Sequence, residues 1–268
     1  MSSLAYTVAD STTMLRRNLK HQLRYPSLTL MLAGFPLVFL LLFVYVLGGQ
    51  LGSGLGGSGA HGGRSAYLTY VVPGILIITV ASAALGTAIS VASDMTGGII
   101  DRFRTMSIAR GAVLIGHVIG SLLQTLVVLV LVIAVAVAIG FRSTANALAW
   151  LATAGVLLLF AVALIWLSAA LGLAAKSVET ASNTPMFLTL LPFLSSGFVP
   201  TDTMPAGLRQ FAEYQPFTAV TQTVRALLTD TPVGTHATVA VAWSAGIAIA
   251  SYLWAGRLYN RRRAATPN

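Results

Sequence analysis

The fold is decided by the stretch Gly97-Gly98-Ile99-Ile100-Asp101-Arg102-Phe103-Arg104-Thr105-Met106-Ser107-Ile108-Ala109-Arg110, a dense patch of mixed charge between two long apolar segments. Residues Tyr67 to Ser93 before it and Gly111 to Ile139 after it contain no Asp, Glu, Lys or Arg. Each segment is long enough to cross a bilayer, which requires about 20 residues. The patch is therefore interpreted as a loop held at a membrane surface, where it either contacts a soluble partner or only orients the chain by its positive charge.

The composition excludes an ordinary soluble domain. Of the 268 residues, 56% are hydrophobic and 9% are charged, and the mean hydropathy is +0.82, far outside the globular range. The net charge is +9, and the basic residues that produce it lie beside apolar spans and not on a water-facing domain. We therefore expect membrane lipid and no nucleic acid as a partner. The absence of cysteine excludes disulfides and thiolate chemistry, and the excess of Arg over Lys suggests a GC-rich bacterial genome.

The sequence predicts an all-α integral membrane protein with one transmembrane domain, residues 1–268. Six apolar segments are expected to span the membrane: 28–48, 67–93, 112–139, 147–175, 183–199 and 237–255. None of the sixteen basic and seven acidic residues lies inside them, and a charge at a helix centre costs about 2.5–3.5 kcal/mol on insertion. The Gly- and Ser-rich stretch from Gly49 to Ser65 lacks the lysine of a phosphate-binding loop and is expected to be a flexible linker.

The basic residues predict the orientation of the chain. If the chain crosses the membrane six times, most of the basic residues fall on one side of the membrane: Arg16, Arg17, Lys20, Arg24, Arg102, Arg104, Arg110, Lys176, Arg257, Arg261, Arg262 and Arg263. The other side has only Arg64, Arg142, Arg209 and Arg225. By the positive-inside rule both termini and the charged loop at 97–110 are cytoplasmic.

The N-terminal residues 11–26 predict an amphipathic interfacial helix. Apolar residues follow helical spacing, the basic residues Arg16, Arg17, Lys20 and Arg24 fall on the other faces, and Pro26 ends the pattern. A basic tail that only sets topology is the alternative interpretation.

The fifth apolar segment is expected to be broken or bent, because it is short and contains Pro185 and Pro192. Interrupted spans occur where protein or a cavity covers the backbone, so this segment is a candidate element of a transport pathway. The region 200–235 after it is too polar to span and predicts two short helices, beginning near Pro205 and Pro216, that dip into the outer leaflet. In the second of these, Phe217 belongs to an apolar face and Arg225 to its polar interruptions.

An enzyme would need a cluster of reactive side chains, and the sequence offers none. His21, His61, His117 and His236 are scattered, with no spacing typical of a metal site, and Ser196 has no histidine inside the membrane to activate it. We therefore expect no catalytic, metal or nucleotide-binding residue. Ion-coupled carriers usually place an ionisable residue inside the membrane, and no Asp, Glu, Lys or Arg is found inside the predicted spans. This argues for a nucleotide-hydrolysing partner docked on residues 97–110, with an ATP-independent secondary carrier or channel as the alternative.

The sequence resembles the permease subunits of type-2 ABC exporters, specifically the daunorubicin-resistance (DrrB-like) branch. The resemblance covers nearly the whole chain and rests on blocks that occur in the family's order: Val72-Pro73-Gly74-Ile75, Gly98 to Arg104 with Ile108-Ala109-Arg110, Ser195 to Pro200, Met204-Pro205, Gln215-Pro216 and Val224 to Leu228. One departure is that the family often has a glutamate just before the glycine of the second block, where this chain has only Asp94 nearby.

The resemblance implies a permease that pairs with a second, identical or homologous permease chain and with two ABC ATP-binding subunits, which would hold the ATP and Mg. Residues 11–26 would be the elbow helix and 200–235 the re-entrant outer helices, including Pro205, Pro216, Phe217 and Arg225. The coupling helix that docks on the ATPase would comprise Asp101, Arg102, Phe103, Arg104 and Ile108. Candidates for the pathway are Pro73, Gly74, Pro192, Ser195, Ser196 and Phe198. The implied function is export of an amphipathic drug-like or lipid-like molecule across the bacterial inner (plasma) membrane, with drug, glycolipid and peptide all left open as substrates.

Overall fold

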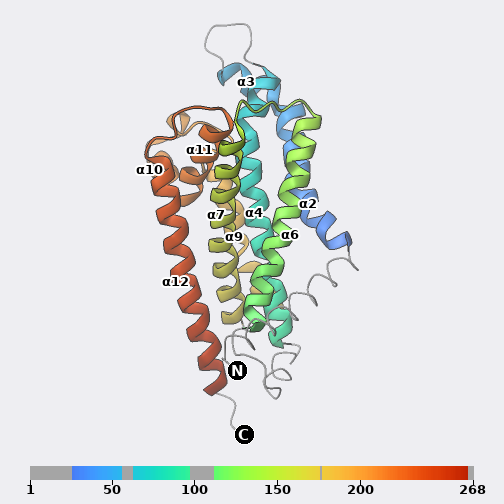
Figure 1. Cartoon of the computed structure of the whole chain (residues 1–268), viewed down its shortest axis with the longest axis vertical. Coiled ribbons are helices and arrows are strands. Elements are labelled where there is room, and N and C mark those ends of the chain that lie inside the picture. Colours follow the sequence, from blue (N-terminus) through green and yellow to red (C-terminus); the bar gives the residue numbers. More distant parts are fainter. Residues whose placement is uncertain (1–25, 56–62, 97–111, 176, 265–268) are drawn as a thin grey trace.

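The computed structural model describes residues 26–55, 63–96, 112–175 and 177–264, and every regular element in these ranges is helical. Five helices among them are long and apolar enough to cross a membrane: Leu32–Gly52, Arg64–Thr96, Leu114–Ala138, Ala147–Ala174 and His236–Tyr259. They stand side by side as an elongated bundle (Figure 1). In order, they belong to α2 (Pro26–Leu41) with its continuation, α4 (Arg64–Thr96), α6 (Ala112–Ala138), α7 (Ala147–Ala174) and α12 (His236–Ala264).

The central helix of the bundle is α4. Its most apolar window is 78% buried within the chain, compared with 22% for α12, and it contacts α2, α6, α7 and α11 (Pro216–Leu228). A helix that is apolar on every side is stable only when other elements surround it. Small residues permit close packing here, because a Cβ added at Gly172 of α7 would lie 2.6 Å from the Ala88 carbonyl oxygen of α4.

The peripheral helix α12 packs on α7 through one stripe of small residues. Ala240, Ser244, Ser251 and Ala255 are buried, and Trp166 of α7 meets Tyr252 edge to face at a ring distance of 5.0 Å. The other faces of α12 expose large apolar side chains such as Trp243, Ile249 and Leu253. Such faces are suited to contact with lipid chains.

The first long helix does not end where the sequence predicted a linker. α2 continues through a π-helical segment, η1 (Leu42–Leu47), into α3 (Gly48–Leu55), so the prediction of a flexible linker at 49–65 is wrong for its first part. The guanidinium carbon of Arg64 lies 3.7 Å from the centre of the Tyr45 ring, which fastens the start of α4 to this helix. Tertiary contacts of this kind override the low helix propensity of glycine.

The chain after α7 is broken in the way that the prolines predicted. The predicted span 183–199 is not one helix but part of a run of short pieces: α8 (Val178–Asn183), α9 (Met186–Leu190) and the 3-10 helix η2 (Leu191–Leu194). Pro185 precedes α9 and Pro192 lies at the start of η2, where a proline lacks the N–H that would extend a helix. We call residues 178–199 the broken segment.

The broken segment runs alongside α4 and antiparallel to it. At one end Ala181 is buried with Ala92 and Ala175, and at the other end the backbone of Gly197 lies against Gly74. At about 1.5 Å of rise per helical residue, the distance along α4 from Ala92 to Gly74 is roughly 27 Å. The broken segment therefore covers a length close to the thickness of the hydrocarbon core, about 30 Å.

The region after the broken segment forms the two short helices that the prolines predicted. The 3-10 helix η3 (Thr201–Thr203) leads into α10 (Ala206–Tyr214), and α11 follows at once. Both helices lie at the end of the bundle that also carries α3 (Figure 1), which we call the α11 end. The opposite end, where α4 stops at Thr96 and α6 starts at Ala112, we call the Asp94 end.

Candidate functional site

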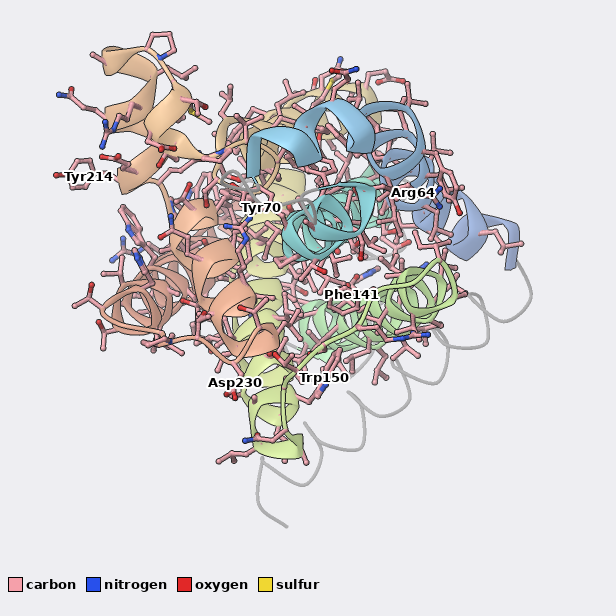
Figure 2. The ribbon with its side chains drawn as sticks, turned by 90° about the horizontal axis from the view of Figure 1, so that it is seen from above. Arg64, Tyr70, Phe141, Trp150, Tyr214 and Asp230 are labelled. Atoms are coloured by element: carbon pink, nitrogen blue, oxygen red, sulfur yellow. The ribbon has the colours of Figure 1, made fainter. Side chains whose placement is uncertain are left out.

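A single guanidinium joins three elements at the α11 end. Nη2 of Arg225 donates to the carbonyl oxygen of Ser196 at 2.7 Å and to that of Tyr70 at 3.2 Å. The guanidinium carbon lies 3.8 Å from the centre of the Tyr70 ring, in the range of a cation–π contact. Arg225 thus connects α11, the broken segment and α4 at a half-buried position, and Figure 2 shows Tyr70 between the helices.

Backbone oxygens and a ring balance the charge of Arg225. Among the described residues no carboxylate lies within ion-pair distance of it. Burial lowers the pKa of the Arg225 guanidinium below its ordinary value, and the neighbouring Tyr70 opposes that change, but guanidinium groups keep their proton in proteins. Hydrogen bonds from a charged donor contribute about 1.5–3 kcal/mol each, so this junction is among the stronger polar contacts of the α11 end.

Side chains of α4 satisfy the irregular backbone of the broken segment. The Tyr70 hydroxyl donates to the Ser196 carbonyl at 3.0 Å, and the Tyr67 hydroxyl donates to the Phe198 carbonyl at 3.2 Å. Backbone groups that are buried without a helical partner must find one elsewhere. The two tyrosines are three residues apart and so project from the same face of α4.

α11 presents a polar stripe to the same backbone. The side-chain amide of Gln215 donates to the Leu194 carbonyl at 2.5 Å, and the Thr218 hydroxyl accepts from the Ser196 N–H at 3.3 Å. Together with Arg225 these residues follow the spacing of one helix face. The opposite face carries Phe217, which is buried and meets Phe160 of α7 edge to face at 5.1 Å, so α11 is amphipathic in both sequence and structure.

A close backbone contact of the site joins Gly74 and Gly197. A Cβ added at Gly74 would lie 2.7 Å from the Gly197 carbonyl oxygen, so only glycine permits this approach. Phe198 then stacks on Phe43 at a ring distance of 4.6 Å and on Phe193 at 5.1 Å. The broken segment is therefore seated on α4 by a glycine contact and held by aromatic packing beside it.

The structure gathers the predicted pathway residues into one cluster inside the chain. All six are buried, at or near the contact between α4 and the broken segment: Pro73, Gly74, Pro192, Ser195, Ser196 and Phe198. Of the predicted outer residues, Phe217 and Arg225 join this cluster, whereas Pro205 and Pro216 mark the starts of α10 and α11. We call the contacts among α4, the broken segment and α11 the closure.

A second polar contact lies at the Asp94 end. Nε2 of His117 in α6 lies 3.0 Å from Oδ2 of Asp94 in α4, and both side chains are mostly buried, with 9% and 14% exposed. The two residues flank segment 97–111 in the sequence. The contact ties the two helices together beside the ends of that segment.

The predicted coupling and elbow residues lie outside the described residues. They are Asp101, Arg102, Phe103, Arg104 and Ile108 of the coupling loop and Arg16, Arg17, Lys20 and Arg24 of the interfacial helix. Their roles stay predictions.

Sequence reasoning missed three partners of the site. It treated His117 as an isolated residue and did not single out Tyr67 or Tyr70. The sequence did contain a signal for the two tyrosines, because they lie at the start of an uncharged span just before Pro73. The pairing of Asp94 with His117 left none, because it joins residues 23 apart across a loop.

The architecture described above, long apolar helices around α4 with one broken segment, is that of a multi-pass membrane protein. Comparison with known families makes this specific: the chain belongs to the ABC-2 type transporter family, whose sequence profile matches residues 11–229. The chain is 28% identical to the daunorubicin resistance ABC transporter permease protein DrrB1 of Streptomyces coeruleorubidus, over 97% of this chain and 89% of that protein. It is 21% identical to the probable doxorubicin resistance ABC transporter permease protein DrrC of Mycobacterium tuberculosis, over 67% of this chain and 65% of that protein.

Proposed function

We propose that this chain is the membrane-spanning permease subunit of an ATP-driven ABC exporter that moves an amphipathic, drug-like or lipid-like molecule out of a bacterial cell. The observation that carries the proposal is its membership of the ABC-2 type transporter family over most of its length. The names of its relatives support a drug-like substrate. The chain itself performs no chemistry in this proposal, and ATP and Mg bind to the partner ATPase.

The broken segment is the sixth membrane crossing in this proposal. The support is its path of roughly 27 Å along α4, which approaches the thickness of the hydrocarbon core, about 30 Å. Six crossings place the Asp94 end in the cytoplasm together with both termini, as the positive-inside rule favours. The α11 end then faces outward, with α10 and α11 as re-entrant helices.

Two ATPase subunits and a second permease chain complete the transporter that we propose. Each ATPase docks on a coupling helix formed by Asp101 to Ile108, and residues 11–26 form the elbow helix at the membrane surface. In this proposal Asp94 and His117 stabilise the coupling helix, because their contact holds together α4 and α6, the helices that precede and follow it in the sequence.

α4 is suited to carry force from the coupling helix to the closure. It spans Arg64–Thr96 without a break, ends close to the coupling segment and holds the closure at Tyr67, Tyr70 and Gly74. A shift of α4 against the broken segment would separate Gly74 from Gly197 and open the α11 end. The largely uncharged surroundings, rich in Phe, Leu and Ser, suit an amphipathic substrate.

Gentle purification of the chain from its native membranes tests the proposal. We expect an ABC ATP-binding subunit to accompany it, with vanadate-sensitive ATP hydrolysis. Replacing Arg102, Phe103 and Arg104 together with alanine is expected to release the ATPase, whereas the control Arg142→Ala, at the α11 end, retains it. Recovery of the chain without an ATPase, with transport that persists without ATP, would instead support a secondary carrier or channel.

A further inference from the structure

We infer that Arg225 is a positioning residue that keeps the α11 end closed, by clamping the broken segment onto α4 until the transport cycle releases it. The inference rests on the proposed function, because only a transporter has a closed state. Its structural part, that Arg225 holds the broken segment against α4, can be tested without ATP or substrate. Its contacts with the described residues are made to the Ser196 and Tyr70 carbonyls and to the Tyr70 ring, so we infer that it acts on transport through the broken segment.

The geometry of Arg225 suits a clamp that joins separate elements. Its Nη2 donates to Ser196 and Tyr70, and its Nε also faces the Tyr70 carbonyl at 3.4 Å. The sequence separations of 29 and 155 residues show that these bonds connect α11 to distant parts of the chain. A planar guanidinium can reach two acceptors and a ring at once, which the point charge of lysine cannot.

The bond from Arg225 to the Ser196 carbonyl ends on a segment that has no regular helix to hold it, whereas the bonds to the Tyr70 carbonyl end on α4. Ser195 to Pro200 lies beyond η2 and before η3, so its position depends on contacts made by other elements. The Ser196 carbonyl accepts from both Arg225 and Tyr70, which uses both of its lone pairs. Removal of the guanidinium leaves the glycine contact and the weaker neutral hydrogen bonds to hold the segment.

The Ser196 side chain offers a reporter that does not disturb the clamp. It is 2% exposed, and its hydroxyl has no hydrogen-bond partner among the described residues, so Ser196→Cys changes no bond of the closure. The wild-type chain contains no cysteine, so a single introduced thiol is the only site that a maleimide can label.

The experiment measures the rate at which a water-soluble maleimide labels Ser196→Cys in the full-length chain in lipid nanodiscs. We expect slow labelling with Arg225 present, and labelling about tenfold faster with Arg225→Met. Arg225→Lys is expected to give an intermediate rate. The matched control Arg209→Met, which removes an exposed arginine of α10, leaves the rate unchanged.

A second thiol separates opening of the closure from loss of the fold. Ser168 of α7 is fully buried away from the closure, and Ser168→Cys stays protected in the Arg225→Met background if only the closure opens. Equal protection of Ser196→Cys with and without Arg225, or simultaneous exposure of Ser168→Cys, would overturn the inference. With the ATPase partner, ATP and vanadate should raise the labelling of Ser196→Cys in the otherwise wild-type chain. Failure of this last step alone would refute the proposed function and the release of the clamp by the transport cycle, and would leave standing only the clamping of the broken segment by Arg225.

Discussion

Adding one methyl group at Gly74 tests the contact that seats the broken segment on α4. The new Cβ of Gly74→Ala would lie 2.7 Å from the carbonyl oxygen of Gly197 and 2.9 Å from its carbonyl carbon. Both atoms belong to the backbone, so no side-chain rotation relieves the overlap. The two elements must separate by roughly 0.7 Å to restore an ordinary contact of 3.4 Å, and overpacking of this kind costs about 1–3 kcal/mol.

The expected result is a lower melting temperature for the purified Gly74→Ala chain. With a shift of about 2–4 °C per kcal/mol for a chain of this size, the decrease should be several degrees, measured by intrinsic fluorescence in detergent. Gly155→Ala is the matched control, because a Cβ there meets nothing within 4 Å and alanine is the better helix former. We expect the melting temperature of Gly155→Ala to equal that of the wild type or to exceed it.

The close backbone contact would be refuted if Gly74→Ala and Gly155→Ala melted together at the wild-type temperature. A second readout is the labelling of Ser196→Cys, which should accelerate when Gly74 is replaced because the broken segment is displaced. A decrease in melting temperature without faster labelling would place the damage elsewhere in α4.

Three further substitutions test other contacts. Gly172→Ala should lower the melting temperature in the same way, because its Cβ would lie 2.6 Å from the Ala88 carbonyl oxygen, and a wild-type melt would contradict the close packing of α4 and α7. His117→Ala removes a mostly buried partner of Asp94 and should destabilise the chain by about 1–3 kcal/mol; recovery of part of this loss by His117→Gln, which restores a donor, would show that the hydrogen bond matters. Arg209→Ala should leave the melting temperature unchanged, because its ion pair one turn along α10 is exposed and screened by salt, and a clear decrease would show that α10 depends on that pair.

The sequence was sufficient to predict the long helices and the position of the break. Long, strongly apolar segments without charge predict lipid-facing or core helices, and α6 and α7 match the predicted spans 112–139 and 147–175 within one residue at each end. Proline is informative where it lies in a short segment, because it lacks the N–H that would extend a helix, although Pro36 and Pro73 lie inside the continuous helices α2 and α4. Pro185 and Pro192 accordingly coincide with the pieces of the broken segment.

The tertiary contacts of the closure could not be predicted in the same way. Arg225 was recognised only as a polar position of an amphipathic helix, because its partners are backbone oxygens, which any sequence provides. In the sequence, Tyr67 and Tyr70 cannot be distinguished from the aromatic residues that are common at membrane interfaces. The helical path of α3 was missed for a related reason, since the Arg64–Tyr45 contact that holds it joins residues on either side of a Gly-rich stretch.

The chemistry of the Arg225 contacts has a consequence for the acidity of the surroundings. A clamp made from a carboxylate or a histidine would lose strength as the medium became acidic, because one partner would change its protonation. A guanidinium bound to two carbonyl oxygens contains no such group, since carbonyls do not titrate and arginine stays protonated. The Arg225 contacts themselves are therefore expected to be equally strong in acidic and in neutral medium.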